Sequence, residues 1–399
     1  MVKVNKIWLH FSPIISPVFI YPLIWTISIT LTGTKITNNL PSINFSTIFL
    51  IGGNLLILFL LYLIVFSSGK KIYSGKILLD ALDLETLVKF ADRLFKVWAV
   101  GTLIEILLGG GFPFLWVMIG VSKNYTEFGI PTLHGLMNGL FFFCITTFSL
   151  DYFIHGGREK LLKFLPFLLW PVMMLGRGIF LGAILQIGSI YLICKPLNFQ
   201  RILLISSSLF GLIILFGVIG DTRGSGNPFL YLVNPEYLHI IEILPSGVLW
   251  VYIYITSPMG NLIANVDIVK PSYFPLQTLG AILPSVLRDK FQNGSEDPIE
   301  LIDSNLNVST FYSNFLADYG VIGALVMVSI IHLIIMLIYL RVREGKAWAM
   351  VAYSVLFQCM IFSIFVNLFL LQTYIIQIVL STYCGNLTRK TKRELSRIV

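Results

Sequence analysis

The sequence predicts an all-α, polytopic membrane protein with about ten full transmembrane helices in a single integral membrane domain, residues 1–399. Two observations lead to this prediction. Apolar residues make up 56% of the chain and charged residues only 12%, and apolar runs of spanning length recur along its whole length. Such a composition excludes a water-soluble core, so the lipid bilayer is the solvent in which this chain folds.

Ten apolar runs account for the predicted spans. A helix of about twenty residues crosses the hydrocarbon layer, and the run at 161–175 is the short one. The first run lacks a small-residue cleavage site, so we expect it to stay in the protein as an anchor. The runs lie near 13–32, 46–66, 94–119, 132–152, 161–175, 177–194, 202–219, 320–340, 347–366 and 367–384.

Two shorter apolar runs, 243–256 and 274–287, contain prolines. We predict that they form one or two re-entrant or interfacial half-helices, since irregular backbone at membrane depth must line a protein cavity. Two full crossings in their place would give twelve spans and leave the side of each terminus unchanged.

Basic residues predict the orientation, because cytoplasmic loops collect Lys and Arg. With the amino terminus inside, most of the 28 basic residues are cytoplasmic, so both termini are expected in the cytoplasm of a bacterium and the protein in its inner membrane. The net charge of +8 then reflects topology and attraction to anionic lipid, with no nucleic acid as partner. The basic residues left outside are Lys35, Lys123, Arg177, Arg223, Lys270, Arg288 and Lys290.

The segment 67–96 is predicted to be a cytoplasmic loop. Within it, residues 74–96 place apolar side chains among acids and lysines at near-helical spacing. This pattern is typical of an amphipathic helix that lies on the membrane surface.

The region between the two apolar halves, 220–319, is the most polar part of the chain. A protein that only crosses a membrane has little use for such a segment, whereas one that acts on a polar substrate at the membrane surface needs it. We interpret it as a large periplasmic catalytic segment. Its ionisable residues are Asp221, Arg223, Glu236, His239, Glu242, Asp267, Lys270, Arg288 and Asp289.

Two ionisable residues outside that segment are candidates for acid–base chemistry. Glu105 lies well inside an apolar run, where a carboxylate is costly unless it is protonated, paired or beside a wet cavity. The glycines at 109–111 and Pro113 are expected to break or kink its helix. His134 is at the outer end of the next helix, where an imidazole can exchange protons near neutral pH. For each residue the alternative is a structural contact.

Arginines on the outer side are candidates for binding a pyrophosphate, because a guanidinium grips phosphate oxygens with two hydrogen bonds. Arg177 lies in a glycine-flanked turn between two runs, and Arg223 follows Asp221 in a turn rich in Gly and Ser. Arg288 ends the second short apolar run. The alternatives are an interfacial arginine for Arg177, a local ion pair for Arg223 and a plain surface residue for Arg288.

Several sequence motifs are missing. The chain has no GxGxxG, Walker A, HExxH or GxSxG motif and no Cys/His cluster, and its four cysteines show no paired spacing. We therefore expect no cofactor, no metal and no nucleotide-dependent step. Any substrate should reach the protein already activated in the membrane.

Taken in order, these pieces resemble the Wzy-type O-antigen polymerases, also called oligosaccharide repeat unit polymerases. The resemblance covers most of the chain and rests on the helix with Glu105, Gly109, Gly110 and Pro113, then YTEFGIPTLHG (Tyr125 to Gly135), LGRG around Arg177, GDTRG around Arg223, WVYIYITSP (Trp250 to Pro258) and FYSNFLADYGVIGAL (Phe311 to Leu325).

The resemblance implies a membrane glycosyltransferase that acts on undecaprenyl-pyrophosphate-linked oligosaccharides at the periplasmic face. The growing glycan would be transferred to the non-reducing end of a new lipid-linked repeat unit. A chain-length regulator and a repeat-unit flippase would work alongside. The implied roles are pyrophosphate binding for Arg177, Arg223 and Arg288, acid–base chemistry or sugar contacts for His134, Asp221 and Glu236, shaping of the cavity for Glu105, and sugar contacts for Tyr125, His239, Trp250 and Tyr254.

Two alternatives stay open. An O-antigen ligase would use the same donor with a different acceptor. A transporter or flippase would place its charged residues along a path through the helix bundle, whereas here the ionisable groups concentrate outside it. Aromatic residues of the outer segment could also form a membrane-interface belt.

Overall fold

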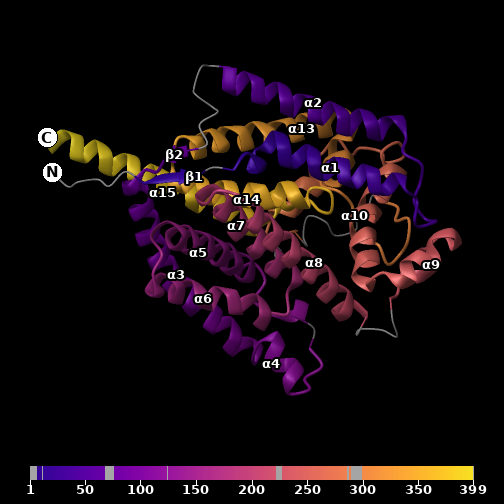
Figure 1. Cartoon of the computed structure of the whole chain (residues 1–399), viewed down its shortest axis with the longest axis horizontal. Coiled ribbons are helices and arrows are strands. Elements are labelled where there is room, and N and C mark those ends of the chain that lie inside the picture. Colours follow the sequence, from indigo (N-terminus) through magenta and orange to yellow (C-terminus); the bar gives the residue numbers. More distant parts are fainter. Residues whose placement is uncertain are drawn as a thin grey trace.

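The computed structural model describes residues 7–10, 12–67, 76–123, 125–221, 227–284, 287–288 and 299–398. This part of the protein is built almost entirely of α-helices (Figure 1). Six of the described helices are long and apolar enough to cross a membrane: Phe45–Val65, Ala81–Met118, Leu133–His155, Arg177–Cys194, Ser246–Asn265 and Tyr312–Arg343. The expectation of an all-α membrane protein is confirmed in this respect, while the predicted number of spans exceeds these six.

The described elements follow one another along the chain in this order. The first half contains β1 (Trp8–His10), α1 (Pro17–Gly33), α2 (Phe45–Ser67), β2 (Lys76–Leu78), α3 (Ala81–Gly109), α4 (Pro113–Met118), α5 (Leu133–His155), α6 (Arg158–Met173), α7 (Arg177–Cys194) and α8 (Phe199–Asp221). The second half contains α9 (Pro235–Ile243), α10 (Ser246–Asn265), α11 (Leu276–Ile282), α13 (Tyr312–Arg343), α14 (Ala347–Phe362) and α15 (Gln372–Ile398).

The core is formed around α5 and α14. All residues from Gly139 to Asp151 and from Ala349 to Met360 are buried. α14 packs against α1, α7, α13 and α15, and α5 packs against α3, α6, α7 and α15. A helix that is apolar all round belongs inside a bundle, and these two meet that description. Helices at the periphery, such as α2 and α8, instead expose large apolar side chains, as lipid-facing helices do.

α3 differs from the sequence prediction at its start and agrees with it at its end. The amphipathic stretch that we placed on the membrane surface is continuous with the following apolar run in one helix of 29 residues. The predicted break beside Glu105 is confirmed, because Gly110 and Gly111 have φ angles of 68° and 123° and the chain restarts as α4 at Pro113. These left-handed angles cost a glycine little, which explains why the helix ends there.

The two short apolar runs of the outer segment form helices of different lengths. Most of the run at 243–256 lies in α10, a helix of 20 residues that begins at Ser246 and continues through Pro258, so this helix is longer than the predicted half-helix. The run at 274–287 contains α11, which is only seven residues long. The buried Asp318 of α13 accepts hydrogen bonds from the backbone N–H groups of Gln277 (2.9 Å) and Thr278 (2.7 Å), which holds the first turn of α11 in place.

The described part of the polar segment has a small hydrophobic core of its own. Tyr252 of α10 is central to it, and its hydroxyl donates to Leu31 O (3.2 Å) and accepts from Ile36 N (3.1 Å) at the end of α1. Asn261 and Asn265 of α10 bind the backbone of the irregular stretch 299–308 with the nitrogen and the oxygen of each side-chain amide. The members of the core are Leu40, Phe229, Leu232, Val233, Leu249, Trp250, Tyr252, Ile253 and Leu306.

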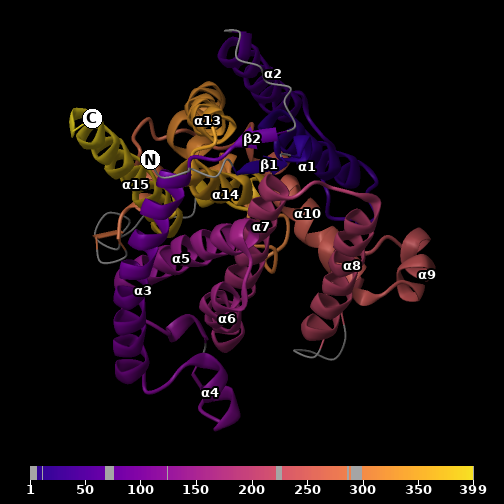
Figure 2. The same ribbon diagram turned by 60° about the vertical axis from the view of Figure 1, so that its left-hand side comes forward.

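Segments that we predicted to be cytoplasmic meet at one end of the bundle. β1 and the carboxyl-terminal half of α15 lie at this end, whereas α4 and α9 lie away from it (Figures 1 and 2). Lys346, before α14, and Lys392, in α15, both contact Asp80 at the start of α3. The start of α3, the turn before α14 and the carboxyl-terminal part of α15 therefore meet at one end of the molecule.

Candidate functional site

The structure brings together two of the sequence-predicted residues, Glu105 and His134. Glu105 lies in the last turns of α3 and is 1% exposed, and His134 is the second residue of α5. Nδ1 of His134 is 3.3 Å from Oε2 of Glu105, and the other carboxylate oxygen, Oε1, accepts a hydrogen bond from Ile130 N at 3.1 Å. A buried carboxylate is costly in a membrane protein unless it is paired, and these two contacts supply its partners.

The loop between α4 and α5 fixes the position of the imidazole. Gly129 has a φ of 98°, and a Cβ atom there would lie 2.5 Å from Cγ of His134. Thr132 also has a positive φ, 74°, which a β-branched residue rarely adopts. Backbone strain of this kind persists only where the surrounding structure enforces it and clusters at functional sites. The local backbone is therefore shaped to seat His134 against Glu105.

Aromatic rings form one wall of this acid–imidazole pair. The Phe128 ring packs edge-on against the His134 ring, with ring centroids 5.4 Å apart. Its centroid also lies 6.0 Å from that of Trp116 in α4 and 6.1 Å from that of Trp170 in α6. Lys123 donates to Gly109 O at 3.0 Å, and its ammonium lies 5.1 Å from the Trp116 ring centre. The pair thus has a buried acid on one side, an apolar wall on another and a cation nearby, while the His134 side chain stays 26% exposed.

A second pair of predicted residues meets at the end of α8. Nε1 of Trp250 donates to Oδ1 of Asp221 at 2.9 Å, and Trp250 stacks on Tyr254 with ring centres 5.9 Å apart. A Cβ atom on Gly220 would lie 2.5 Å from the indole, so only glycine lets α8 and α10 approach this closely. Trp250 is 7% exposed and packs in the small core described above, so the indole holds the Asp221 carboxylate and leaves little ring surface for a ligand.

The remaining predicted residues are placed as follows. Arg177 is the first residue of α7, partly exposed, two residues after Leu175, which has a φ of 51°. Glu236 and His239 lie on α9, a helix without buried residues. Arg288 is exposed. Arg223 and the side chain of Tyr125 lie outside the described residues.

Three polar residues, Asp318, Asn44 and Lys123, were missed as site residues by sequence reasoning. Asp318 was quoted only as part of a motif, yet it organises α11, and Asn44 donates to Asp267 at 2.9 Å. Lys123 was counted only for orientation. Their importance depends on partners 14 to more than 200 residues away, so the local pattern held no sign of it.

Metal ligation was tested in the part of the chain that the structure describes. It holds no group of three or more His, Cys, Asp or Glu side chains that could bind a metal ion. The two acid-containing pairs described above each contribute a single carboxylate.

Comparisons with known proteins give no relative: the chain matches no protein-family model, no curated protein and no solved structure.

Proposed function

We propose that this protein is a membrane glycosyltransferase, an O-antigen polymerase that joins oligosaccharide repeat units carried on undecaprenyl pyrophosphate. The observation that carries the proposal is the contact between the buried Glu105 and the partly exposed His134. It supplies a base of the kind that the transfer of a sugar to a hydroxyl needs. The ordered resemblance of the chain to the Wzy-type polymerases gives the substrate class.

In the proposed reaction, His134 is the general base. The Nδ1 atom of the imidazole faces Glu105. A carboxylate at Nδ1 keeps the proton there and leaves Nε2 to accept one, as in other His–carboxylate pairs. The terminal hydroxyl of a new lipid-linked repeat would lose its proton to Nε2 while its oxygen bonds to the first sugar carbon of the growing glycan. The bond from that carbon to the pyrophosphate breaks, and undecaprenyl pyrophosphate leaves with the electron pair.

Cations on the same side would stabilise the leaving pyrophosphate. Arg177, at the start of α7, and Arg223 are our first candidates, with Arg288 third. We add Lys123, which lies in the connection between α4 and α5 that positions His134 and has its ammonium beside the Trp116 ring. Donors that face the negative charge developing in the transition state make the largest single contribution to the rate enhancement of many enzymes.

The sugars would be held by the outer segment. Asp221, held by the Trp250 indole, offers an acceptor, Tyr254 beside it offers an aromatic ring, and Glu236, His239 and Tyr125 offer further polar contacts. In this proposal the protein lies in a bacterial inner membrane with both termini in the cytoplasm and the site in the periplasm. A chain-length regulator and a repeat-unit flippase are the expected functional partners.

The test is the lipopolysaccharide banding pattern of a strain that lacks the gene, complemented with variants. We expect wild type to restore the ladder, and His134→Ala and Glu105→Gln to express normally yet leave mainly core with one repeat unit, because general-base catalysis contributes about 10²–10⁴-fold. His155→Ala is the matched control: it is on the same helix and also contacts a carboxylate, Asp151 (2.7 Å), but at the opposite end.

The same gels separate the alternatives. If the deletion leaves bare core while polymer accumulates on the carrier lipid, the protein is a ligase. Loss of repeat units from the outer face of the membrane would point to transport. A normal ladder with both His134→Ala and Glu105→Gln would refute the assignment of the base.

A further inference from the structure

A cavity of about 40 Å³ lies at the end of the bundle opposite α4 and α9, where the start of α3 meets α13, α14 and α15. This volume has room for about three water molecules, or for the oxygens of a phosphate group in their place. The residues that line it are Asp83, Arg341, Lys346, Trp348, Gly385, Thr388, Arg389 and Lys392.

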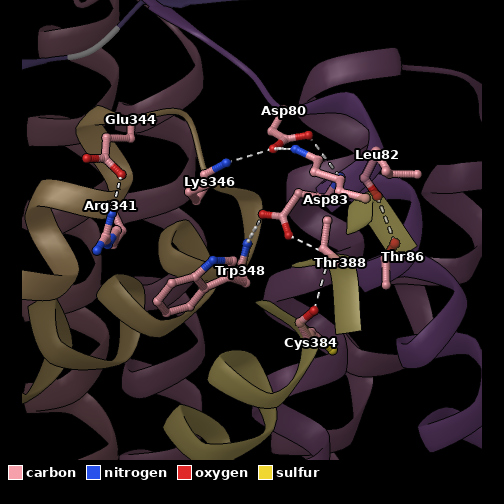
Figure 3. Close-up of polar contacts among 11 residues, drawn as sticks. Asp80, Leu82, Asp83, Thr86, Arg341, Glu344, Lys346, Trp348, Cys384 and Thr388 are labelled. Atoms are coloured by element: carbon pink, nitrogen blue, oxygen red, sulfur yellow. Dashed lines mark hydrogen bonds and ion pairs between the residues drawn. The ribbon is translucent and has the colours of Figure 1, made fainter. Parts of the chain in front are cut away.

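The carboxylates around this cavity are engaged with protein donors. Asp83 accepts from Trp348 N at 3.1 Å through one oxygen and from the Thr388 hydroxyl at 2.8 Å through the other (Figure 3). Asp80 accepts from Lys346 at 2.8 Å and from Lys392. The oxygens of both acids are therefore committed to neighbours in the protein.

The basic groups have hydrogen-bonding capacity left over. Each ammonium carries three N–H bonds and a guanidinium five. Lys346 and Lys392 each make one contact to Asp80, and Arg341 makes one to Glu344 at 2.7 Å. Four basic side chains line the cavity: Arg341, Lys346, Arg389 and Lys392. Three acids lie among them, namely Asp83 in the lining, Asp80 paired with Lys346 and Lys392, and Glu344 paired with Arg341. The site therefore has one positive charge in excess.

We propose that this cavity binds the phosphate group of an anionic ligand, and that an anionic phospholipid supplies it. Basic pockets between membrane helices bind the headgroups of such lipids. Trp348, an interfacial type of residue, forms part of the wall, and the peripheral helices around the bundle expose apolar side chains to lipid. A phosphodiester carries a single negative charge, which matches the excess. This site is independent of the proposed transferase chemistry.

The experiment counts lipids retained by the purified full-length protein in native mass spectrometry, after exchange into phosphatidylglycerol or phosphatidylcholine. We expect phosphatidylglycerol to be retained in preference, and Arg389→Gln to weaken its retention by about fivefold, the contribution of one basic residue near a membrane surface. Lys89→Gln is the matched control, since it removes an equal charge from α3 at an exposed Glu85–Lys89 pair outside the cavity.

A second variant and a second ligand complete the test. Arg341→Gln removes another cavity residue whose own ion pair is partly exposed and contributes little to stability. If inorganic phosphate raises the melting temperature of wild type but not of these two variants, while phosphatidylglycerol is not retained, the phosphate source is soluble. Equal retention of both lipids by wild type and both variants, with no effect of phosphate, would overturn the proposal.

Discussion

At the scale of single residues, the protein depends on glycines that let two side chains or backbones meet. Gly129 leaves space for the His134 ring, and Gly220 leaves space for Trp250. The first also has a left-handed backbone, which adds a conformational requirement to the steric one. Both glycines sit beside candidate site residues rather than in the α5–α14 core.

Gly129→Ala tests this requirement. The new Cβ atom would lie 2.5 Å from Cγ of His134, so the imidazole must move away from Glu105. We expect the lipopolysaccharide ladder to be lost and the protein to be destabilised by about 1–2 kcal/mol, from strain at a positive φ. Thermal unfolding in detergent measures the loss of stability.

Gly211→Ala is the control, because nothing lies within 4 Å of its Cβ position in α8. Alanine is favoured over glycine in a helix by up to about 1 kcal/mol, so stability should hold or rise. An intact ladder with Gly129→Ala would mean that the Glu105–His134 contact is dispensable.

At the scale of elements, an ionic contact joins three segments that are far apart in the sequence. Asp80 caps α3 by accepting from Asp83 N at 3.3 Å, and it also binds Lys346 and Lys392. The turn before α14 fits closely beneath β2, because a Cβ atom on Gly345 would lie 1.9 Å from Leu78 O. The start of α3, the α13–α14 turn and the end of α15 are therefore fastened at one point (Figure 3).

The stability of this junction should depend on pH. Burial alone would raise the pKa of Asp80, but the hydrogen bonds from Lys346 and Lys392 outweigh it and lower the pKa below its ordinary value. The ionised carboxylate therefore stabilises the fold at neutral pH, and this contribution is lost as the pH falls through the lowered pKa. We expect the melting temperature of wild type to decrease once the pH is lowered past about 4, which is near the ordinary pKa of an aspartate.

Asp80→Asn should lower the melting temperature at pH 7 and flatten its dependence on acid. Asp92→Asn is a suitable comparison, since Asp92 pairs with Lys163 at 2.8 Å with both side chains largely exposed, and such pairs contribute about 0–1 kcal/mol. Identical acid profiles for wild type and Asp80→Asn would exclude Asp80 as the group responsible.

At the scale of the whole molecule, a buried amide network ties the central helices together. Nε2 of Gln186 donates to Gln358 (2.8 Å) and Gln377 (3.1 Å), and Oε1 of Gln186 accepts from Gln377 (2.7 Å) and from the Thr146 hydroxyl (2.7 Å). Gln358 in turn donates to the Tyr374 hydroxyl (2.9 Å). The network therefore connects α5, α7, α14 and α15 within the apolar core, where an unpaired amide would be costly.

Gln358→Ala should destabilise the bundle as a whole. It removes the acceptor for Gln186 and the donor to Tyr374, and hydrogen bonds between membrane helices contribute about 0.6–1.7 kcal/mol each. The expected result is a single, cooperative unfolding transition at lower temperature in detergent. Gln372→Ala, at the partly exposed start of α15 and outside the amide network, should leave the transition unchanged. Loss of local structure without a lower temperature of the main unfolding transition would contradict a role of Gln358 in holding the bundle together.

The sequence by itself determined the solvent of this protein, its helical class and the break in α3. Composition decides whether water or lipid surrounds the chain. Glycine permits backbone angles that other residues avoid, and proline ends or kinks a helix, so a break can be predicted from a short stretch of sequence. It also selected Glu105, His134, Asp221 and Trp250 as separate candidates.

The tertiary structure alone decided which of these residues meet. Glu105 pairs with His134 and Asp221 pairs with Trp250 because helix packing brings together positions 29 residues apart in each case. It also joined the amphipathic stretch to α3 and made α10 a helix of 20 residues that begins after Pro245 and packs against α1 and α8. Contacts of this kind depend on how whole helices pack against one another, and no local pattern in the sequence specifies that packing.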